Sequence, residues 1–496
     1  MRLSRRRLLG TFAVGASAAF LAACSGGGGA SAPAAPAKPA ESKPAESKPA
    51  EAAKPAESKP AAPAAAPAAT TAPAAAAPPA SSGGAPVTIN VIAWNSGSSA
   101  EAFKNAMAGI NDKFKQKRSN VTINFEPLGQ GATWTNAQMS RIAGQTADVT
   151  ATYGFAPQDI INFQPDNQFI DISSISSLKN FDQTNVKRFM TWKGKVWQLT
   201  LAYVGHIVWT NDDMLGKYNV KPATTYAEWN AMCETLKSNK EQPVFYAAKP
   251  QTALSRFASL AEMHVGRAKH PTFWQDMLVR GKADFTTPEW IESFKRAKDF
   301  VKNNLDPAFS GIDYPTGAGL FATGKYGMWP EGSFSGGDIM AAKPAFQKLG
   351  AFTGAFGDDA AQNAIQPVYG DLGWAGLRYT KNTDMVVEWI DFFGQKENFT
   401  SFMQVLQYYP TMTDAKLTGP VPEAEAPLLK KTAVSQVRLG LPGMTFDNNW
   451  GDLLLSDQYT PESFAKYYQK NWEDSRPQWQ KYIGMFDDDW AKLYFS

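Results

Sequence analysis

The feature that most restricts how this chain can fold is a long low-complexity stretch, residues 25–86. It consists mainly of Ala, Pro, Lys, Glu, Ser and Gly, has no aromatic residue, and repeats Pro-Ala-Glu-Ser-Lys-Pro between Pro39 and Pro60. Such a composition cannot bury enough apolar surface to offset the entropy lost on ordering. Its prolines favour an extended tether, with a contour of about 190 Å at roughly 3 Å per residue. We therefore expect a protease-sensitive leash and a folded body that begins near residue 87.

The residues before this tether have the features of a bacterial export signal, residues 1–23. A basic run that ends at Arg7 precedes an apolar stretch over 11–20 that is too short to remain as a membrane span. Leu21-Ala22-Ala23-Cys24 has the pattern of a lipobox, so Cys24 is expected to carry a lipid. The paired arginines are typical of the twin-arginine signal, although ordinary Sec signals also begin with arginines. The sequence predicts an extracytoplasmic protein held to the membrane by its lipid.

The folded body opens with strand and helix patterns in alternation. An alternating β-branched run covers 87–95, apolar residues at helical spacing cover 100–114, and alternation returns over 121–125. A further short strand is expected over 147–151. Strands that alternate with helices predict an α/β fold with a mostly parallel sheet. Ligands bind such sheets at the carboxyl ends of the strands, which points to the loops that carry Trp94, Asn95 and Tyr153.

The stretch over 320–334 predicts a helix, a strand, a loop and another helix in that order. Apolar residues run up to Gly324, which suits the end of a helix, and continue as a short strand. The pattern breaks at Pro330, after which Ser333 and Ser335 would suit the start of a helix.

The loop within this stretch carries an aromatic face, Trp329 or Phe334, and a carboxylate, Glu331. In an α/β fold a loop between a strand and a helix faces the ligand. The alternative is that both aromatic rings belong to the core and Glu331 lies on the solvated surface.

The second cysteine has no partner, because the lipobox assigns Cys24 to a lipid. No disulfide within the mature chain is expected. Cys233 shares a helical face with Trp229, Met232 and Leu236, which predicts a buried, inert thiol rather than a nucleophile.

A longer stretch, residues 194–215, carries a resemblance to a known family. It reads Gly-Lys-Val-Trp-Gln-Leu-Thr-Leu-Ala-Tyr-Val-Gly-His-Ile-Val-Trp-Thr-Asn-Asp-Asp-Met-Leu. It resembles the segment between the lobes in the family 1 extracellular solute-binding proteins of ABC importers, with Thr200 in place of the usual Pro. Residues 222–229, 320–334 and 370–382 resemble further segments of that family in the correct order.

The resemblance covers almost the whole body and implies a two-lobed, clamp-like periplasmic-binding-protein architecture (type II) with several interlobe crossings. It places the first lobe at about 87–201 and 373–410, and the second at about 202–372 and 411–496. It implies a monomeric receptor, not an enzyme, that delivers a captured solute to the permease subunits in the membrane.

The sequence offers little support for other functions. Gly317-Ala-Gly-Leu-Phe-Ala322 fits a dinucleotide pattern, but no strand precedes it. The three histidines lack metal-site spacing, so no metal and no cofactor are expected. The formal charge of +3 includes four signal arginines, so the mature chain is near 3 − 4 = −1 and carries no footprint for nucleic acid. A glycosidase remains open, because its paired carboxylates have no fixed spacing.

The aromatic residues point to the class of ligand. Aromatic side chains make up 12% of the chain, and several fall in expected loops at strand ends: Trp94, Trp134, Tyr153, Tyr203, Trp329, Trp374 and Trp450. A sugar presents C–H faces to such rings and hydroxyls to polar neighbours, which Asn95, Glu331, Asp371 and Arg378 would supply. We therefore expect a carbohydrate, with a non-sugar ligand as the alternative, although core packing is the alternative for each single aromatic residue.

Overall fold

The structure is a computed structural model, and it describes residues 84–94, 100–129, 131–249, 253–435, 441–444 and 450–495. The expected signal, Cys24, the tether and Asn95 lie outside the described residues.

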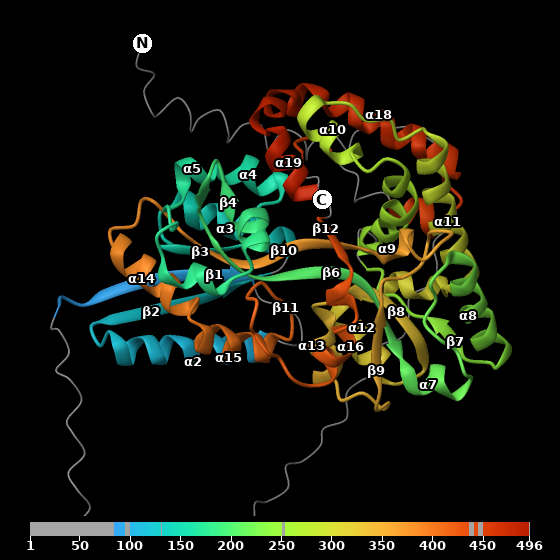
Figure 1. Cartoon of the computed structure of the whole chain (residues 1–496), viewed down its shortest axis with the longest axis horizontal. Coiled ribbons are helices and arrows are strands. Elements are labelled where there is room, and N and C mark those ends of the chain that lie inside the picture. The colour runs from blue at the N-terminus through green and yellow to red at the C-terminus, as the bar shows by residue number, and fades with distance from the viewer. Residues whose placement is uncertain are drawn as a thin grey trace, which may run out of the picture. The chain divides into compact units, whose positions relative to one another are not determined.

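A first half-sheet is formed by β2 (Val121–Leu128), β1 (Val87–Trp94) and β3 (Val149–Thr152), in that order and all parallel. The helices α2 (Ala100–Lys117) and α3 (Gly131–Ala143) connect these strands. One face of α2 is buried, as the helical spacing of its apolar residues predicts. The predicted order β-α-β is therefore confirmed, and Figure 1 shows this half-sheet on the left.

A second half-sheet contains β8 (Tyr326–Gly332), with β7 (Gln242–Val244) parallel to it, and β9 (Leu349–Phe352). The larger helices of this part of the chain are α8 (Tyr226–Ser238), α9 (Leu254–Ala261), α11 (Pro288–Asn304), α12 (Tyr314–Ala322) and α13 (Ser335–Ala341). In Figure 1 these elements lie on the right.

Two long strands join the half-sheets, β6 (Leu199–Asn211) and β10 (Ile365–Gly376). Residues 199–205 of β6 pair with β10, and residues 206–211 pair with β8 and β9. The strands consequently form one hydrogen-bonded path, β2-β1-β3-β10-β6-β8-β7, rather than two separate sheets. The cause is the length of β6, which continues without interruption from one half-sheet into the other.

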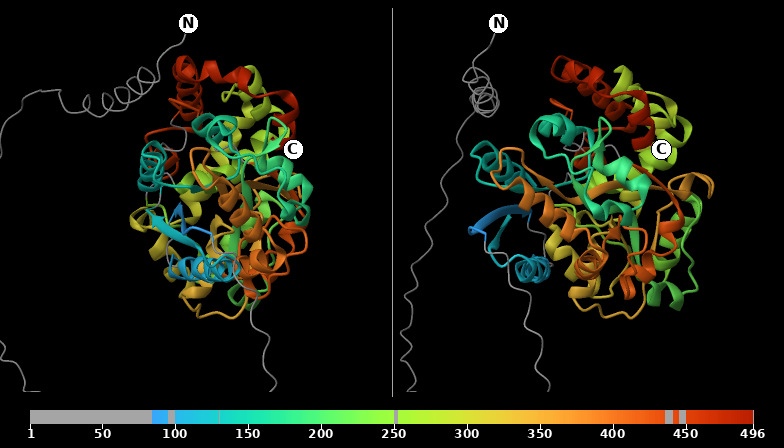
Figure 2. Two further views of the ribbon diagram at one scale, coloured as in Figure 1. Left: turned by 90° about the vertical axis from the view of Figure 1, so that its left-hand side faces the viewer. Right: turned by 60° about the vertical axis from the view of Figure 1, so that its left-hand side comes forward.

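The chain crosses between the half-sheets again after β10. The helices α14 (Thr383–Phe393) and α15 (Lys396–Leu406) pack against α2, and β11 (Tyr409–Pro410) pairs with β6. Next α16 (Pro420–Glu425) packs by β9, and β12 (Thr432–Ser435) pairs with β10. The last helices are α17 (Trp450–Leu454), α18 (Pro461–Trp479), which packs on α11, and α19 (Asp488–Phe495). Figure 2 shows α18 along one side of the body.

The remaining elements are short. They are α4 (Pro157–Phe163), α5 (Pro165–Gln168), η1 (Ser176–Asn180), α6 (Gln183–Asn185), η2 (Val186–Met190), β4 (Thr191–Trp192), β5 (Lys195–Val196), α7 (Asp212–Lys217), η4 (Glu262–Arg267), α10 (Phe273–Arg280), η5 (Pro307–Gly311), η6 (Gln362–Ala364), η7 (Leu428–Lys430) and η9 (Gln480–Met485). Among the described residues, no helix combines the length and apolarity that crossing a membrane requires.

The stretch over 320–334 forms α12, β8, a short loop and α13, which confirms the predicted order. The predicted break at Pro330 is wrong, because β8 continues to Gly332. Beyond Met328 this strand no longer pairs with β7, so a residue without an N–H is tolerated there. The serines are not helix caps either: Ser335 Oγ donates to Gly332 O (2.7 Å) and Ser333 Oγ accepts from Gly205 N (3.2 Å).

The predicted buried thiol is also confirmed. Cys233 lies on α8 with Trp229, Met232 and Leu236 on the buried face of the helix. Burial raises the pKa of the Cys233 thiol to about 12, so it is a protonated core group at neutral pH.

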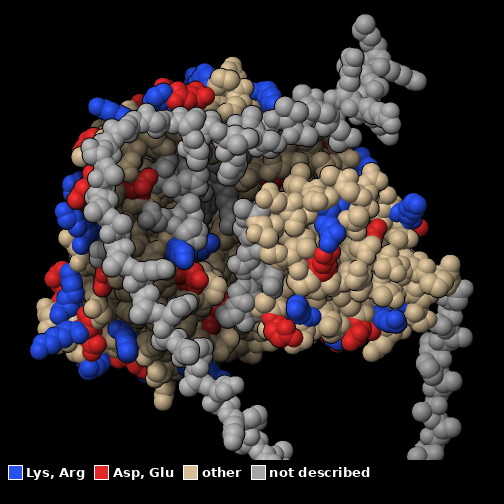
Figure 3. All heavy atoms as spheres, turned by 180° about the vertical axis from the view of Figure 1, so that it is seen from behind, with Lys and Arg blue, Asp and Glu red and all other residues tan. Residues whose placement is uncertain are grey.

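Charged side chains of both signs are mixed over the face shown in Figure 3. This face shows no extended patch of a single sign.

Candidate functional site

The carboxyl ends of two strands converge on the middle of β10. On β3, Thr152 lies opposite Gly373, and on β12, Ser435 lies opposite Val368. Because β3 is antiparallel and β12 parallel to β10, the two strands run toward each other and stop on either side of 369–372. The carboxyl edge of an α/β sheet at such a change of direction is where ligands bind. We take this region as the candidate site.

The end of β8 reaches the same region from the other half-sheet. Gly332 lies opposite His206 of β6, and Gly205, the preceding residue, lies opposite Val368 of β10. The loop after β8 is tied to this point, since Ser333 N donates to Gly205 O at 2.8 Å. The ends of β3, β12 and β8 therefore meet around the paired middle parts of β6 and β10, which we call the crossing.

Two glycines allow the backbone to come close at this crossing. Gly154, just after β3, has φ +36°, and a Cβ added to it would lie 2.6 Å from the Cα of Gly370. Any larger residue at Gly154 would push the loop after β3 away from β10.

An aromatic platform ends the first half-sheet. The rings of Trp94 and Tyr153 are stacked, with centroids 4.4 Å apart and planes 6° from parallel. Trp134 packs edge-on against Trp94 at 5.7 Å. Trp94 and Trp134 are buried, whereas Tyr153 is half-buried, so Tyr153 is the member of the cluster that reaches solvent.

The loop of the second half-sheet presents a guanidinium over an aromatic ring. Arg256 lies 5.4 Å above the centroid of Phe334, and its Nη1 donates to Glu331 Oε1 at 3.0 Å. The Gly332 N–H donates to the same oxygen at 3.0 Å. The Arg256 side chain is 32% exposed while that of Glu331 is fully buried. Glu331 thus holds the guanidinium from below and leaves its outer side accessible.

The charges of this pair follow from its surroundings. Burial raises the pKa of the Glu331 carboxyl, and the nearby Arg256 guanidinium and the Gly332 N–H oppose that rise. Burial lowers the pKa of Arg256, but the Glu331 carboxylate more than offsets this, so Arg256 stays protonated. Glu331 Oε2 has no hydrogen-bond partner. The pair is therefore a fixed, polar element at the start of the loop.

A second buried polar pair lies beside Phe334. The Tyr314 hydroxyl donates to Asp338 Oδ2 at 2.6 Å, and the Tyr314 ring lies 5.5 Å from that of Phe334. Asp338 is buried, and its Oδ1 has no hydrogen-bond partner. Burial, and then the charge of Asp338, raise the pKa of Tyr314 well above its usual value, so the hydroxyl remains a donor.

A third polar cluster lies where β6, β10 and β11 meet. The rings of Tyr203 and Tyr409 are 5.2 Å apart, and Gln366 Nε2 donates to the Tyr409 hydroxyl at 3.0 Å. Glu425 of α16 is only 3% exposed and its Oε1 has no partner. Burial raises the pKa of Glu425 well above its usual value, and burial, with Glu425 nearby, raises that of Tyr203 to about 12.

The structure brings several of the predicted residues to this region. Trp94 and Tyr153 form the platform, Glu331 and Phe334 form the loop, and Tyr203 lies at the crossing. Asp371 also lies there, buried on β10, and its Oδ1 accepts from the Leu372 N–H at 3.0 Å.

Two predicted site residues lie in the core instead. Trp329 is fully buried and packs against Phe245 at 5.6 Å. Trp374 is fully buried and packs against Trp389 at 5.6 Å and Phe393 at 5.7 Å, under α14. Trp329 lies on the same face of β8 as Glu331, and its ring is also 6.0 Å from that of Tyr314. In this structure both Trp rings are enclosed by core side chains.

Sequence reasoning missed most of the polar members of the site. Arg256, Tyr314 and Asp338 lie on three different helices and carry no local motif. Glu425 lies at the end of the short helix α16 and likewise belongs to no motif. Tyr409 left one usable signal, because the aromatic pair Tyr408-Tyr409 directly precedes a proline, a common sign of an edge strand.

Each of the three histidines lies within hydrogen-bond distance of another residue of the chain. His206 Nδ1 lies 2.5 Å from Ser259 Oγ, His264 Nε2 lies 2.9 Å from Ile365 O, and His270 Nε2 lies 3.2 Å from Glu289 Oε2. Within the described ranges, no group of three or more His, Cys, Asp or Glu is arranged to hold a metal ion.

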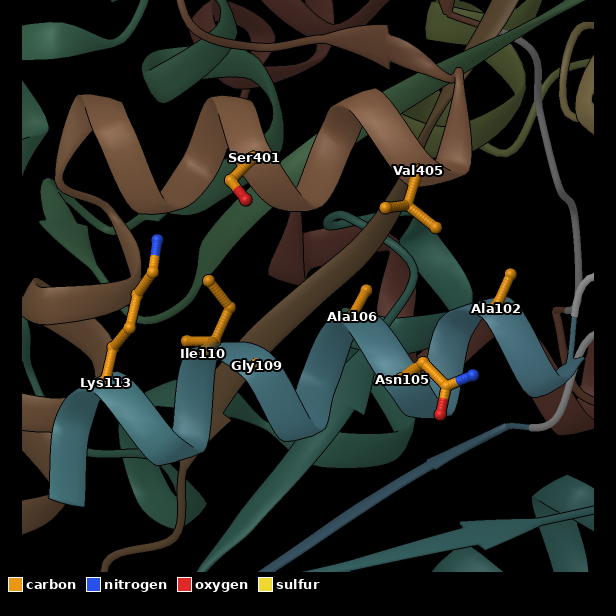
Figure 4. A pocket seen from close by; sticks show the side chains of 8 residues that line it. All are labelled: Ala102, Asn105, Ala106, Gly109, Ile110, Lys113, Ser401 and Val405. Carbon is orange, nitrogen blue, oxygen red and sulfur yellow. The ribbon is translucent and has the colours of Figure 1, made fainter. Parts of the chain in front are cut away.

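A groove between α2 and α15 offers a different surface (Figure 4). It is lined by small, apolar and amide side chains and one lysine: Ala102, Asn105, Ala106, Gly109, Ile110 and Lys113 of α2, and Ser401 and Val405 of α15. It has neither aromatic rings nor carboxylates, so it lacks the groups that recognise a sugar.

Several solved structures have the same fold as this chain. A chitin oligosaccharide binding protein aligns at a TM-score of 0.68 with 18% identity, over 79% of this chain and 100% of that chain. The solute-binding protein RafE in complex with raffinose aligns at 0.66 with 16% identity, over 77% and 99%. A sugar transporter from Bacillus licheniformis in complex with stachyose aligns at 0.59 with 17% identity, over 80% and 100%. The fold is that of the two-lobed periplasmic solute-binding proteins.

The family follows from the sequence itself. Residues 110–430 match the family described as bacterial extracellular solute-binding protein, which is more than half of the chain. The chain belongs to this family. No curated protein matches the chain closely enough to count as a relative.

Proposed function

We propose that the protein is a lipid-anchored receptor of an ABC importer that captures a carbohydrate between two lobes and delivers it to the permease. The observation that carries this proposal is the meeting of three strand ends at β6 and β10, with aromatic rings and polar side chains around them. Phe334, with Arg256 above its ring, is the central element.

The chemistry of these groups suits a neutral, hydroxyl-rich ligand. Phe334 and Tyr153 offer half-buried aromatic surface for the C–H face of a sugar ring. Arg256 offers N–H donors on its exposed side, while the oxygens of Asp338 and Glu331 that lack a partner are buried in this structure. Because Glu331 balances the charge of Arg256, the loop does not require a charged ligand. The neighbours in complex with raffinose and stachyose support the same class.

We place the lobe boundaries at the two long strands, with the first lobe at about 87–201 and 373–410 and the second lobe formed by 202–372 and 411–496. The packing of α15 on α2 and of α18 on α11 supports this division. In the clamp motion of such proteins the lobes close around the ligand. Tyr203, Asp371 and the other residues of the crossing would then lie at the floor between them.

Attachment to the membrane is proposed through a lipid on Cys24, followed by the tether. With Cys24→Ser, we expect loss of metabolic palmitate labelling and release of the protein from the membrane fraction. A variant that stays in the membrane fraction without label would contradict lipid anchoring. We also propose that the receptor is a monomer, which sedimentation equilibrium of the Cys24→Ser protein would test.

The ligand is tested by thermal shift against a panel of mono- and oligosaccharides, with an amino-acid and a polyamine panel beside it. A ligand at 100 times its dissociation constant stabilises the folded protein by about 2.7 kcal/mol. We expect a shift with a carbohydrate and with no amino acid or polyamine. A shift with only the non-sugar panels would overturn the proposed ligand class.

Phe334→Ala tests the position of the site. Loss of a stacking ring should weaken binding by about 1.5–3 kcal/mol, or roughly 10- to 150-fold. Phe392→Ala is the matched control, because Phe392 is also half-buried under a cation, with Lys117 5.6 Å from its ring, but lies on the helix α14. Equal affinity of the two variants would place the ligand elsewhere.

A tethered glycoside hydrolase is the alternative, since carboxylates are present around the crossing. The receptor returns its sugar intact, whereas the hydrolase releases reducing ends. Incubation of the identified oligosaccharide with stoichiometric protein, followed by chromatography, distinguishes the two. Recovered cleavage product that disappears in Glu331→Gln would favour the hydrolase.

A further inference from the structure

The C-terminal helix α19 is carried by the second lobe. The helix before it, α18, packs on α11, and η9 packs against α10. Asp488, at the start of α19, accepts hydrogen bonds from Gln275 Nε2 at 2.8 Å and from Arg280 Nη2 at 2.7 Å, both on α10. At the other end of α19, Arg267 Nη2 donates to Phe495 O. These contacts hold both ends of α19 on elements of the second lobe.

The same helix also packs against the first lobe and is hydrogen-bonded to it. Trp192 of β4 packs edge-on against Trp490 at 5.5 Å and against Phe486 at 5.6 Å. Arg188 of η2 donates through Nε to Leu493 O at 3.3 Å. Trp192, Trp490 and Phe486 are all buried. The helix α19 therefore contacts both lobes, through α10 and η2, and it also packs against β12, which pairs with β10.

Arg188 adds hydrogen bonds to the aromatic contacts between α19 and the first lobe. It is buried and donates to the main-chain carbonyls of Leu493 and of Ala433. Ala433 lies on β12, so Arg188 contacts the second lobe at two elements. The aromatic rings and the hydrogen bonds of Arg188 both favour the closed contact.

Whether the contact between α19 and the first lobe is open or closed would depend on the angle between the two lobes. By the division proposed above, the backbone passes between the lobes near Ala202 of β6 and near Leu372 of β10. A rotation about these strands would separate α19 from Trp192 and Arg188, while its bonds to α10 would be kept. We propose that α19 is an interlobe strap that fixes the angle between the lobes in the unliganded protein through its grip on Trp192 and Arg188.

The test measures the lobe angle directly and needs no ligand, so its outcome is separate from that of the sugar screen. Spin labels are placed on exposed positions of the two lobes, Lys104→Cys on α2 and Lys302→Cys on α11, in the full chain with Cys24→Ser. Pulsed electron–electron double resonance spectroscopy then gives the distribution of distances between the two spin labels.

The structure predicts a clear set of outcomes. Trp490→Ala and Trp192→Ala should each broaden the distance distribution, and the double variant should be no broader than either single variant, because both break one contact. Asp489→Ala is the matched control on the exposed side of α19 and should leave the distribution unchanged. An unchanged distribution in both Trp variants, or additive broadening in the double variant, would overturn the strap.

A second variant keeps the test decisive if a Trp variant fails to give the far-ultraviolet circular dichroism of the parent. Arg188→Met removes the hydrogen bond to Leu493 O but keeps an apolar side chain in the buried position. It should broaden the distribution as well. If it folds and the distances stay as in the parent, the proposal is wrong.

Discussion

Glu425 gives the most quantitative prediction, because a single substitution should change how stability depends on pH. The residue is 3% exposed, its Oε1 has no hydrogen-bond partner, and burial raises its pKa well above the ordinary 4.5. Glu425→Gln keeps the shape of the side chain and removes the titration. The exposed neighbour on the same helix, Glu423→Gln, is the matched control.

The magnitude follows from proton linkage. Between the ordinary pKa and the raised one, the folded protein keeps a proton on Glu425 that the unfolded chain has released. The free energy of unfolding therefore falls by about 1.4 kcal/mol for each pH unit in that range. A folded body of roughly 410 residues has an unfolding entropy of about 0.86 kcal/mol/K, so the melting temperature should fall by about 1.6 °C per pH unit. The Gln variant lacks this loss.

Thermal unfolding followed by circular dichroism at pH 5, 6, 7 and 8 checks this reasoning. The melting temperature of Glu425→Gln minus that of the parent should rise by about 1.6 °C per pH unit until the folded pKa is passed. The same difference for Glu423→Gln should stay flat. A flat difference for Glu425→Gln, or one that falls as pH rises, would show that the carboxyl is not held protonated.

Three further substitutions probe packing and hydrogen bonding. Trp374→Ala should destabilise the protein by about 3–5 kcal/mol in urea unfolding because it empties a core position; a loss below 1 kcal/mol would return Trp374 to the ligand site. Gly154→Ala should cost about 1–3 kcal/mol in the same assay, since its φ is +36° and the added Cβ meets Gly370; an unchanged midpoint would contradict the close backbone approach. Tyr314→Phe should cost about 1–3 kcal/mol in thermal unfolding by removing the donor to buried Asp338; equal stability would mean that this hydrogen bond is not formed.

Much of the fold could be predicted because its signals are local. The strand β1, the helix α2 and the buried face around Cys233 each follow from apolar residues at a fixed spacing within one segment. The order of elements over 320–334 was likewise visible, because it depends on glycine and on changes of periodicity within fifteen residues. The continuity of β6 across both half-sheets was not visible, since pairing partners are set by distant strands.

The site was predicted less completely, and the reason is again distance along the chain. Phe334 and Trp329 sit in the same short stretch, yet only the fold decides that one ring lies under Arg256 and the other in the core. Arg256 pairs with a carboxylate 75 residues away, and the sequence of its own helix does not indicate that partner. Local sequence identifies strand ends well, but it does not say toward which face a side chain turns.

The position of β1 has a mechanical consequence for a protein held by its N-terminus. The proposed tether enters the body at β1, and β1 lies between β2 and β3 with both neighbours parallel to it. Tension on the leash therefore acts along the length of β1, so that its hydrogen bonds on both sides are sheared together rather than peeled one by one. Eight residue pairs with β2 alone share that force. A receptor pulled by flow, or by a docked permease, would be loaded where its sheet resists extension best.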